Sequence, residues 1–278
     1  MATNGSSRTA ASNLPGDKLT PLAITLLATL GVTLGAMLLL WLLATARRDV
    51  TLVDIYWGIG FIVVLGTAMG MNRPTSTRGA VALVLVMLWG MRLAGHLSWR
   101  KWGEPEDRRY QAMRRRHGGR FWWVSLFTVF LLQGLLQWTI AMPLQVIAVS
   151  REATFGTATD VIGLFLWISG FAFEAIGDAQ LLNFQSRPEN RGRVLDRGLW
   201  RYTRHPNYFG ESLLWWGIHL LSLSAGGGWT LFSPVLMTAL LLKVSGVSLL
   251  ESTIVDRRPE YAEYQRRTSP FVPWRPRG

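Results

Sequence analysis

The sequence predicts an all-α membrane protein, a multi-pass bundle of about seven transmembrane helices. Hydrophobic residues make up 49% of the 278 residues, and seven segments approach the roughly 20 apolar residues that a spanning helix needs. The net charge of +12 would suit nucleic acid, but the aromatic residues lie in apolar runs and not in a soluble basic groove. We therefore expect a lipid bilayer, and no nucleic acid, as the environment of the chain.

The predicted elements follow one another with short polar connections. Residues 1–18 are small and polar, are typical of a disordered tail and lack the pattern of a signal peptide. Residues 19–278 are expected to form a single transmembrane domain without internal repeats. The predicted spanning helices are Leu19–Ala46, Val53–Met71, Gly79–Ser98, Phe121–Ile147, Ala158–Leu182, Tyr208–Leu223 and Trp229–Leu250.

The distribution of lysine and arginine predicts the orientation of the bundle. Alternate loops and the C-terminal tail carry 22 of these residues, and the other set of loops and the N-terminal tail carry five. By the positive-inside rule, the C-terminus is then cytoplasmic and the N-terminus is outside. Only three of the basic residues are lysines, which is typical of a GC-rich bacterial genome. We expect an integral protein of the bacterial cytoplasmic membrane.

The stretch Gly198–Glu211 concentrates the chemistry of the chain. Pro206 disfavours a helical conformation at His205 and suits the first turn of the helix that follows. Polar groups at the mouth of a membrane helix are costly, so they indicate a site that holds a polar ligand. An ordinary basic juxtamembrane loop would explain the arginines alone. The polar residues of this stretch are Arg201, Arg204, His205, Asn207, Tyr208 and Glu211.

Charged residues also lie inside the predicted membrane segments. Glu174 and Asp178 are four residues apart, on one helical face, where each carboxylate costs about 2.5 to 3.5 kcal/mol. They either pair with Arg92 or Lys243 of neighbouring helices, or accept hydrogen bonds from a ligand. Arg92 is too far from a helix end to reach water easily, so we expect it to face the bundle interior. Asp54 is explained either by the helix dipole or by a functional role.

Three motifs resemble those of the steroid 5-alpha-reductase-like membrane proteins, most closely their bacterial branch of uncharacterised function. The motifs are Gly198–Glu211, Asp54-Ile-Tyr-Trp-Gly-Ile-Gly60 and the C-terminal stretch Arg258–Thr268, and the resemblance covers roughly residues 50 to 274. It implies an intramembrane NADPH site, since the chain has no dinucleotide-binding Gly-x-Gly-x-x-Gly motif.

The resemblance also implies roles for individual residues. Asp54 corresponds to a catalytic glutamate that polarises the substrate enone, and Trp89 stands where a tyrosine binds the substrate ketone. Asp178 matches an acceptor for nicotinamide, while Glu174 and Glu251 replace an asparagine and a tyrosine. The implied cofactor-binding residues are Arg92, Glu174, Asp178, Arg187, Arg193, Arg204, His205, Asn207, Tyr208, Glu211 and Glu251.

Three functions follow as hypotheses. The first is an NADPH-dependent reductase of a carbonyl-conjugated C=C bond in a lipophilic, steroid- or isoprenoid-like substrate. The arginines between the fifth and sixth predicted helices would then lie near the cofactor phosphates, namely Arg187, Arg193, Arg201 and Arg204. The second is an S-adenosylmethionine-dependent methyltransferase resembling the isoprenylcysteine carboxyl methyltransferases, whose Arg-His-Pro-x-Tyr-x-Gly core Arg204–Gly210 also fits. The third is a binding role without catalysis. No spacing of potential ligands indicates a metal site.

Overall fold

The computed structural model describes residues 19–152, 154–244 and 260–277. In these ranges the chain is helical throughout its regular elements, apart from one isolated bridge between Thr203 and Ser269. The predicted all-α architecture is therefore confirmed for the described part of the chain. The predicted disorder of residues 1–18, the end of the seventh predicted helix and Glu251 lie outside the described residues.

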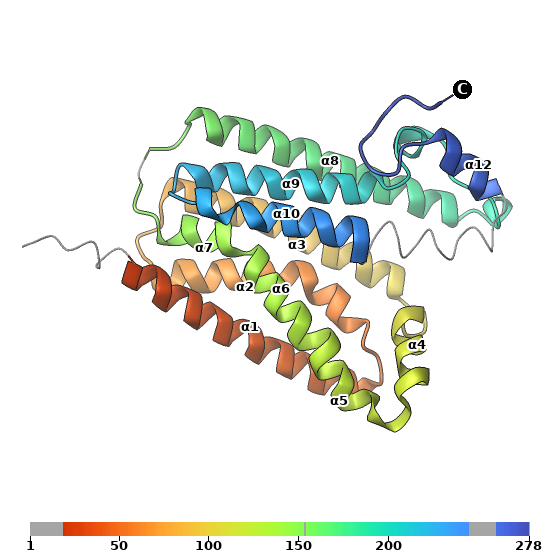
Figure 1. The fold of residues 1–278 in the computed structure, drawn as a ribbon, viewed down its shortest axis with the longest axis horizontal. Coiled ribbons are helices and arrows are strands. Elements are labelled where there is room, and N and C mark those ends of the chain that lie inside the picture. Colours follow the sequence, from red (N-terminus) through yellow and green to blue (C-terminus); the bar gives the residue numbers. More distant parts are fainter. Residues whose placement is uncertain (1–18, 153, 245–259, 278) are drawn as a thin grey trace, which may run out of the picture.

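Long helices form the body of the molecule and run side by side along its long axis (Figure 1). In the described part of the chain, five helical stretches are long and apolar enough to cross a membrane. The sixth and seventh predicted segments are also helical, as α9 (Pro206–Leu223) and as the shorter apolar stretch Gly228–Lys243 that contains α10 (Phe232–Ala239). The five long stretches are Pro21–Arg47 in α1 (Leu19–Arg47), α2 (Leu52–Met71), α3 (Thr77–Lys101), Arg108–Ile140 and α8 (Ala158–Gln185).

The fourth predicted segment is a broken helix. It contains α5 (Phe121–Ser125), a π-helical stretch (Leu126–Leu131), α6 (Leu132–Ile140) and α7 (Met142–Val149). The break between α6 and α7 falls at Ala141, where Pro143 occupies the first turn of α7 and has no N–H to continue the ladder of α6. The prediction of a single continuous helix over residues 121–147 was therefore wrong.

A short helix that was not predicted, α4 (Arg108–His117), lies at one end of the bundle and crosses it, close to the end of α3 (Figure 1). Asp107 caps its N-terminus: its carboxylate accepts from Arg109 N at 2.9 Å. Burial would raise the pKa of Asp107, but hydrogen bonds from Arg109 outweigh burial and hold this pKa below its usual value. Gly118, with φ of 54°, ends α4 and lets the chain turn into α5.

Glycines let α8 and α9 approach one another closely. Gly170 of α8 faces Gly210 of α9, and a Cβ atom at Gly170 would lie 2.5 Å from the Gly210 carbonyl oxygen. Gly163 faces Gly217 in the same way, one heptad along each helix, and Gly177 lies against Pro206. This antiparallel seam of small residues places the polar residues of both helices opposite one another.

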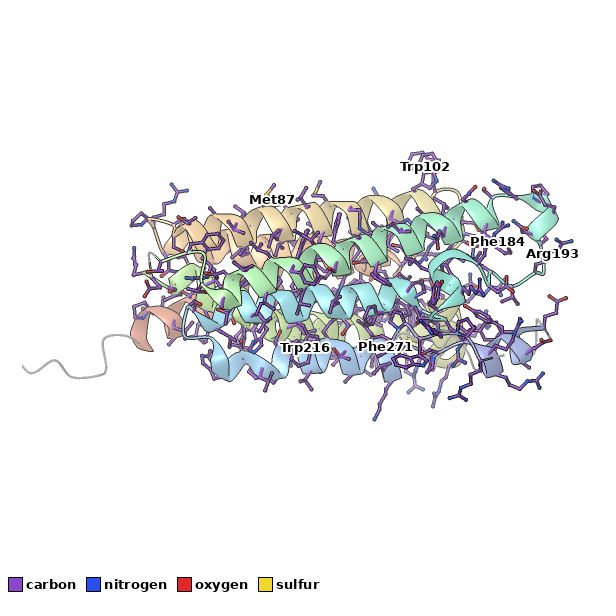
Figure 2. All side chains as sticks on the ribbon, turned by 90° about the horizontal axis from the view of Figure 1, so that it is seen from above. Met87, Trp102, Phe184, Arg193, Trp216 and Phe271 are labelled. Atoms are coloured by element: carbon purple, nitrogen blue, oxygen red, sulfur yellow. The ribbon has the colours of Figure 1, made fainter. Side chains whose placement is uncertain are left out.

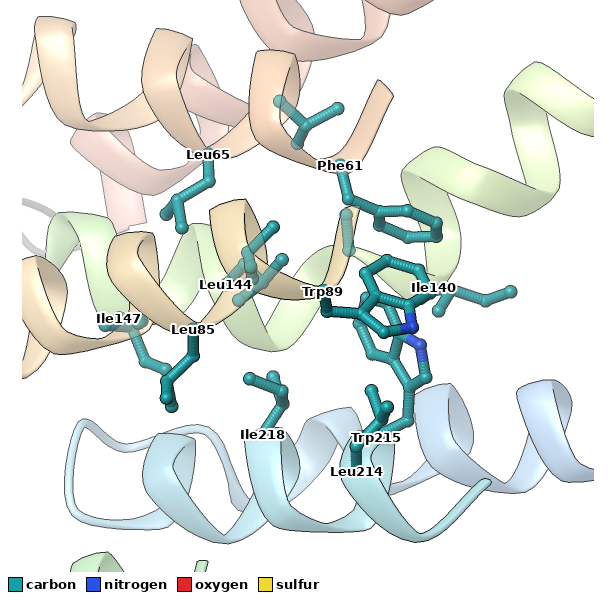
Figure 3. Close-up of a cluster of buried hydrophobic side chains, with 14 of the residues drawn as sticks. Phe61, Leu65, Leu85, Trp89, Ile140, Leu144, Ile147, Leu214, Trp215 and Ile218 are labelled. Carbon is teal, nitrogen blue, oxygen red and sulfur yellow. The ribbon is translucent and has the colours of Figure 1, made fainter. Parts of the chain in front are cut away.

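A cluster of buried hydrophobic residues ties α2, α3 and α9 together. The rings of Phe61, Trp89 and Trp215 meet there, with Trp89 and Trp215 at right angles and 5.6 Å apart (Figure 3). Edge-to-face contacts of this kind are favourable beyond the burial of the rings. Large side chains such as Met87 and Trp102 lie on the outer surface instead (Figure 2).

The C-terminal segment packs on the loop that precedes α9. In α12 (Glu260–Arg267), Tyr264 donates a hydrogen bond to the Trp200 carbonyl, and Arg204 Nη1 donates to the Gln265 carbonyl at 2.8 Å. Thr203 Oγ1 donates to the Phe271 carbonyl at 2.7 Å. These contacts hold the loop in place at the start of α9.

The orientation of the bundle stays a prediction, and reporter fusions test it. Because the loops that carry 22 lysines and arginines alternate with those that carry five, a reporter after residue 278 is expected in the cytoplasm. A reporter before residue 19 is expected outside. Finding both reporters on one side would rule out an odd number of spans.

Candidate functional site

A cavity of about 670 Å³ lies inside the bundle at the α4 end. One part of its wall is apolar and comes from the π-helical stretch, α6, α10 and the residues after α10. The other part is polar and contains six of the residues predicted from the sequence. The apolar wall includes Val129, Leu132, Leu136, Met237, Leu240 and Leu241. The polar wall includes Asp54, Glu174, Asp178, Asn207, Tyr208 and Glu211.

Arg92 joins the two carboxylates of α8 beside this cavity. Its Nη1 lies 2.9 Å from Asp178 Oδ2, and its Nη2 contacts Glu174. Trp89 Nε1 donates to the second Glu174 oxygen at 3.0 Å. Both carboxylates are almost fully buried, and Arg92 forms an ion pair with each of them. The pairing of Glu174 and Asp178 with Arg92, one of the two alternatives from the sequence, is what the structure contains.

Asn207 links α9 to the same group. Its side-chain Nδ2 donates to Asp178 Oδ1 at 3.1 Å, and its Oδ1 accepts from Tyr208 N at 3.0 Å. Asn207 is the second residue of α9, whose N-cap is His205. Glu211 lies one turn further along α9 and also faces the cavity. The glycine seam is what brings these α9 residues to Asp178.

Helix α4 contributes part of the cavity wall next to Asp54. Arg109 Nη2 donates to Asp54 Oδ2 at 2.9 Å, and the Tyr110 hydroxyl donates to Asp54 Oδ1 at 2.8 Å. Gln133 Nε2 donates in turn to the Tyr110 oxygen at 3.3 Å. Asp54 therefore accepts hydrogen bonds from two residues of α4, and all three residues lie in the cavity wall.

Arg109 and Tyr110 of α4 were not among the site residues predicted from the sequence. His96, Arg100 and Gln133, which also line the cavity, were not among them either. The available signal was Tyr110, a buried aromatic residue in a short helix that is mostly charged.

The remaining predicted residues lie apart from the cavity wall. His205 is buried with its ring stacked on that of Tyr208, 5.5 Å away. Arg204 binds carbonyl groups of the C-terminal segment, and Trp89 lies in the hydrophobic cluster. Arg187 and Arg193 belong to the connection after α8, with Arg193 at the tip of the molecule on the same side as Trp102 (Figure 2).

Fold and site together define an all-helical protein with membrane-type helices and a charged cavity among them. The chain belongs to the DUF1295 family of proteins of unknown function, whose family model matches residues 40–268. It is also similar to an uncharacterized protein of Schizosaccharomyces pombe, with 26% identity over 270 residues that cover 84% of this chain and 75% of the relative. No solved structure matches the chain significantly. Family membership agrees with the steroid 5-alpha-reductase-like resemblance, and the bacterial branch stays a prediction.

Proposed function

We propose that this protein is a membrane-embedded NADPH-dependent reductase of a carbonyl-conjugated C=C bond in a lipophilic, steroid- or isoprenoid-like substrate. The observation that supports it most is the two-sided cavity, whose polar wall holds Asp178, Asn207 and Glu211 and whose apolar wall suits a hydrocarbon skeleton. Its volume is in the range of pockets that bind small molecules and cofactors.

The polar wall fits the nicotinamide end of the cofactor. Asn207 offers an amide donor and acceptor, and Asp178 and Glu211 offer acceptors for an amide N–H or ribose hydroxyls. Arg92 Nε is buried beside them without a hydrogen-bond partner among the described residues. Arg100, which lines the same cavity, suits phosphate oxygens of the cofactor. The bound cofactor supplies a hydride to the substrate carbon.

The residues around Asp54 suit the carbonyl end of the substrate. A carbonyl oxygen that gains negative charge during reduction needs hydrogen-bond donors that are already in position. The Arg109 guanidinium is such a donor, because its bonds to Asp54 and Asp107 leave further N–H groups for an oxygen atom. Asp54 orients Arg109 and also accepts the one hydrogen of the Tyr110 hydroxyl.

Ligand-dependent stabilisation of the purified protein tests this function. NADPH at about 100 times its dissociation constant is expected to add about 2.7 kcal/mol to the free energy of unfolding. S-adenosylmethionine at the same concentration is expected to add nothing. Stabilisation by S-adenosylmethionine alone would favour the methyltransferase, and no effect of either compound would favour a binding role.

Substitutions of Asn207 test the cofactor site directly. We expect Asn207→Asp to weaken NADPH binding roughly ten- to a hundredfold. The new carboxylate would lie beside Asp178 and would leave the carboxamide oxygen of nicotinamide without a donor, at a cost of about 1 to 3 kcal/mol. Asn207→Ala should weaken binding less, since water can fill the gap. Both affinities are measured by titration, with the melting temperature as the control for folding. Unchanged affinity in the Asp variant would contradict the assignment.

A further inference from the structure

Helix α4 has two chemically different faces. Its inner face carries Tyr110 and Met113, which pack into the hydrophobic cluster at the α1–α5 end of the bundle. Arg109 and Arg114 are held by acids, namely Asp54 and Glu106 at 2.9 and 2.8 Å. The helix therefore reaches the cavity with one face while it lies across the end of the bundle (Figure 1).

The outer face of α4 and the turn after it carry a second group of arginines, which are exposed. They are Arg108, Arg115, Arg116 and Arg120. No hydrogen bond or ion pair joins their guanidinium groups to any other residue in the described part of the chain. The structure pairs the inward arginines and leaves the outward ones available, so the outer face concentrates positive charge within 13 residues.

Exposed tryptophans mark the level of this face relative to the membrane. Trp122 and Trp123, at the start of α5, are 55% and 42% exposed, and Trp99 and Trp102 at the end of α3 are more so. Trp41 Nε1 donates to the Trp122 carbonyl at 2.7 Å, which holds this part of the chain against α1. Exposed indoles of membrane proteins gather at the boundary between lipid tails and headgroups. An amphipathic helix with arginines beside such indoles is typical of an interfacial helix.

We propose that this outer face is a binding site for the phosphate groups of anionic phospholipids. The α4 basic face consists of Arg108, Arg115, Arg116 and Arg120, flanked by Trp122 and Trp123. Its charge is complementary to anionic headgroups, and its indoles place it at their depth. A lipid bound there holds α4 where Arg109 and Tyr110 contact Asp54. The inference does not depend on the proposed reductase activity.

Native mass spectrometry with phosphatidylglycerol tests the site. Each basic residue near an anionic headgroup strengthens binding by roughly fivefold, so Arg115→Gln/Arg116→Gln should weaken phosphatidylglycerol binding by roughly 25-fold. The control variant Arg191→Gln/Arg201→Gln removes the same charge from exposed positions after α8 and is expected to bind nearly as the parent does. Phosphatidylcholine, which has the same phosphate but no net charge, is the control lipid and should bind far more weakly.

Hydrogen exchange in nanodiscs locates the contact and does not depend on the variants. Residues 108–123 are expected to exchange more slowly in nanodiscs that contain phosphatidylglycerol than in phosphatidylcholine alone. The proposal is overturned if the two double variants lose affinity equally, if phosphatidylcholine binds as tightly as phosphatidylglycerol, or if the protection lies elsewhere on the protein.

Discussion

Replacing Arg92 with glutamine is expected to lower the free energy of unfolding by about 3 to 5 kcal/mol, because it removes one partner of a buried ion cluster. Arg92 is the cation that Glu174 and Asp178 share, and both carboxylates are nearly excluded from water. Among the described residues, the Trp89 indole and Asn207 would remain as the hydrogen-bond donors to these carboxylates. Thermal unfolding in detergent, followed by circular dichroism, measures the loss.

Two further variants give this experiment its controls. Arg191→Gln removes an exposed arginine in the connection after α8 and should leave stability within about 0.5 kcal/mol of the parent. In Arg92→Gln/Glu174→Gln/Asp178→Asn no charge remains to be paired, so part of the stability should return. A triple variant that is no more stable than Arg92→Gln would show that unpaired charge is not the cause.

The variant Gly170→Ala is expected to cost about 3 kcal/mol, at the upper end of the penalties for overpacking. The added methyl group would meet backbone atoms, the Gly210 carbonyl oxygen at 2.5 Å and the Leu214 nitrogen at 2.6 Å. Backbone cannot move aside as a flexible side chain can, so α8 and α9 must separate. Separation moves Asp178 away from Asn207, and NADPH affinity should fall at temperatures where the variant is still folded.

Gly66→Ala is the matched control for this substitution. Gly66 is exposed on α2, and a Cβ atom there would have no neighbour within 4 Å. We expect this variant to be as stable as the parent or slightly more stable, because alanine favours the helix over glycine. Equal melting temperatures for the two alanine variants would contradict the role assigned to the seam.

Helix positions could be predicted well from the sequence because apolar runs end at charged or proline-containing connections. The prediction Val53–Met71 differs from α2 (Leu52–Met71) by one residue, and the N-terminal boundary of α8 was predicted correctly. The break at Ala141 and the separate helix α4 were missed. Both depend on short-range backbone features, Pro143 and Gly118, inside or beside a segment whose overall composition is apolar.

The candidate site was predicted in its residue types more than in its contacts. Asp54, Arg92, Glu174 and Asp178 were predicted as site residues because they are charged and lie in apolar segments, where a charge is costly and usually has a function. The sequence left Arg92 and Lys243 open as partners of Glu174 and Asp178, and it indicated no partner for Asp54. The partners of Asp54 lie 55 and 56 residues away, and Arg92 is more than 80 residues from its carboxylates.

Composition and the length of apolar runs by themselves determined that this chain is helical and suited to a membrane, because isolated backbone polar groups in lipid must be satisfied within a helix. The polar stretch Gly198–Glu211 likewise predicted a ligand site, and its residues Asn207, Tyr208 and Glu211 line the cavity. Only the tertiary structure decided that α4 covers Asp54, that Trp89 is packed in the hydrophobic cluster and that Asn207 meets Asp178. These contacts depend on how each helix is rotated and how closely its glycines let it approach a neighbour, and both are properties of packed helices and not of any one segment.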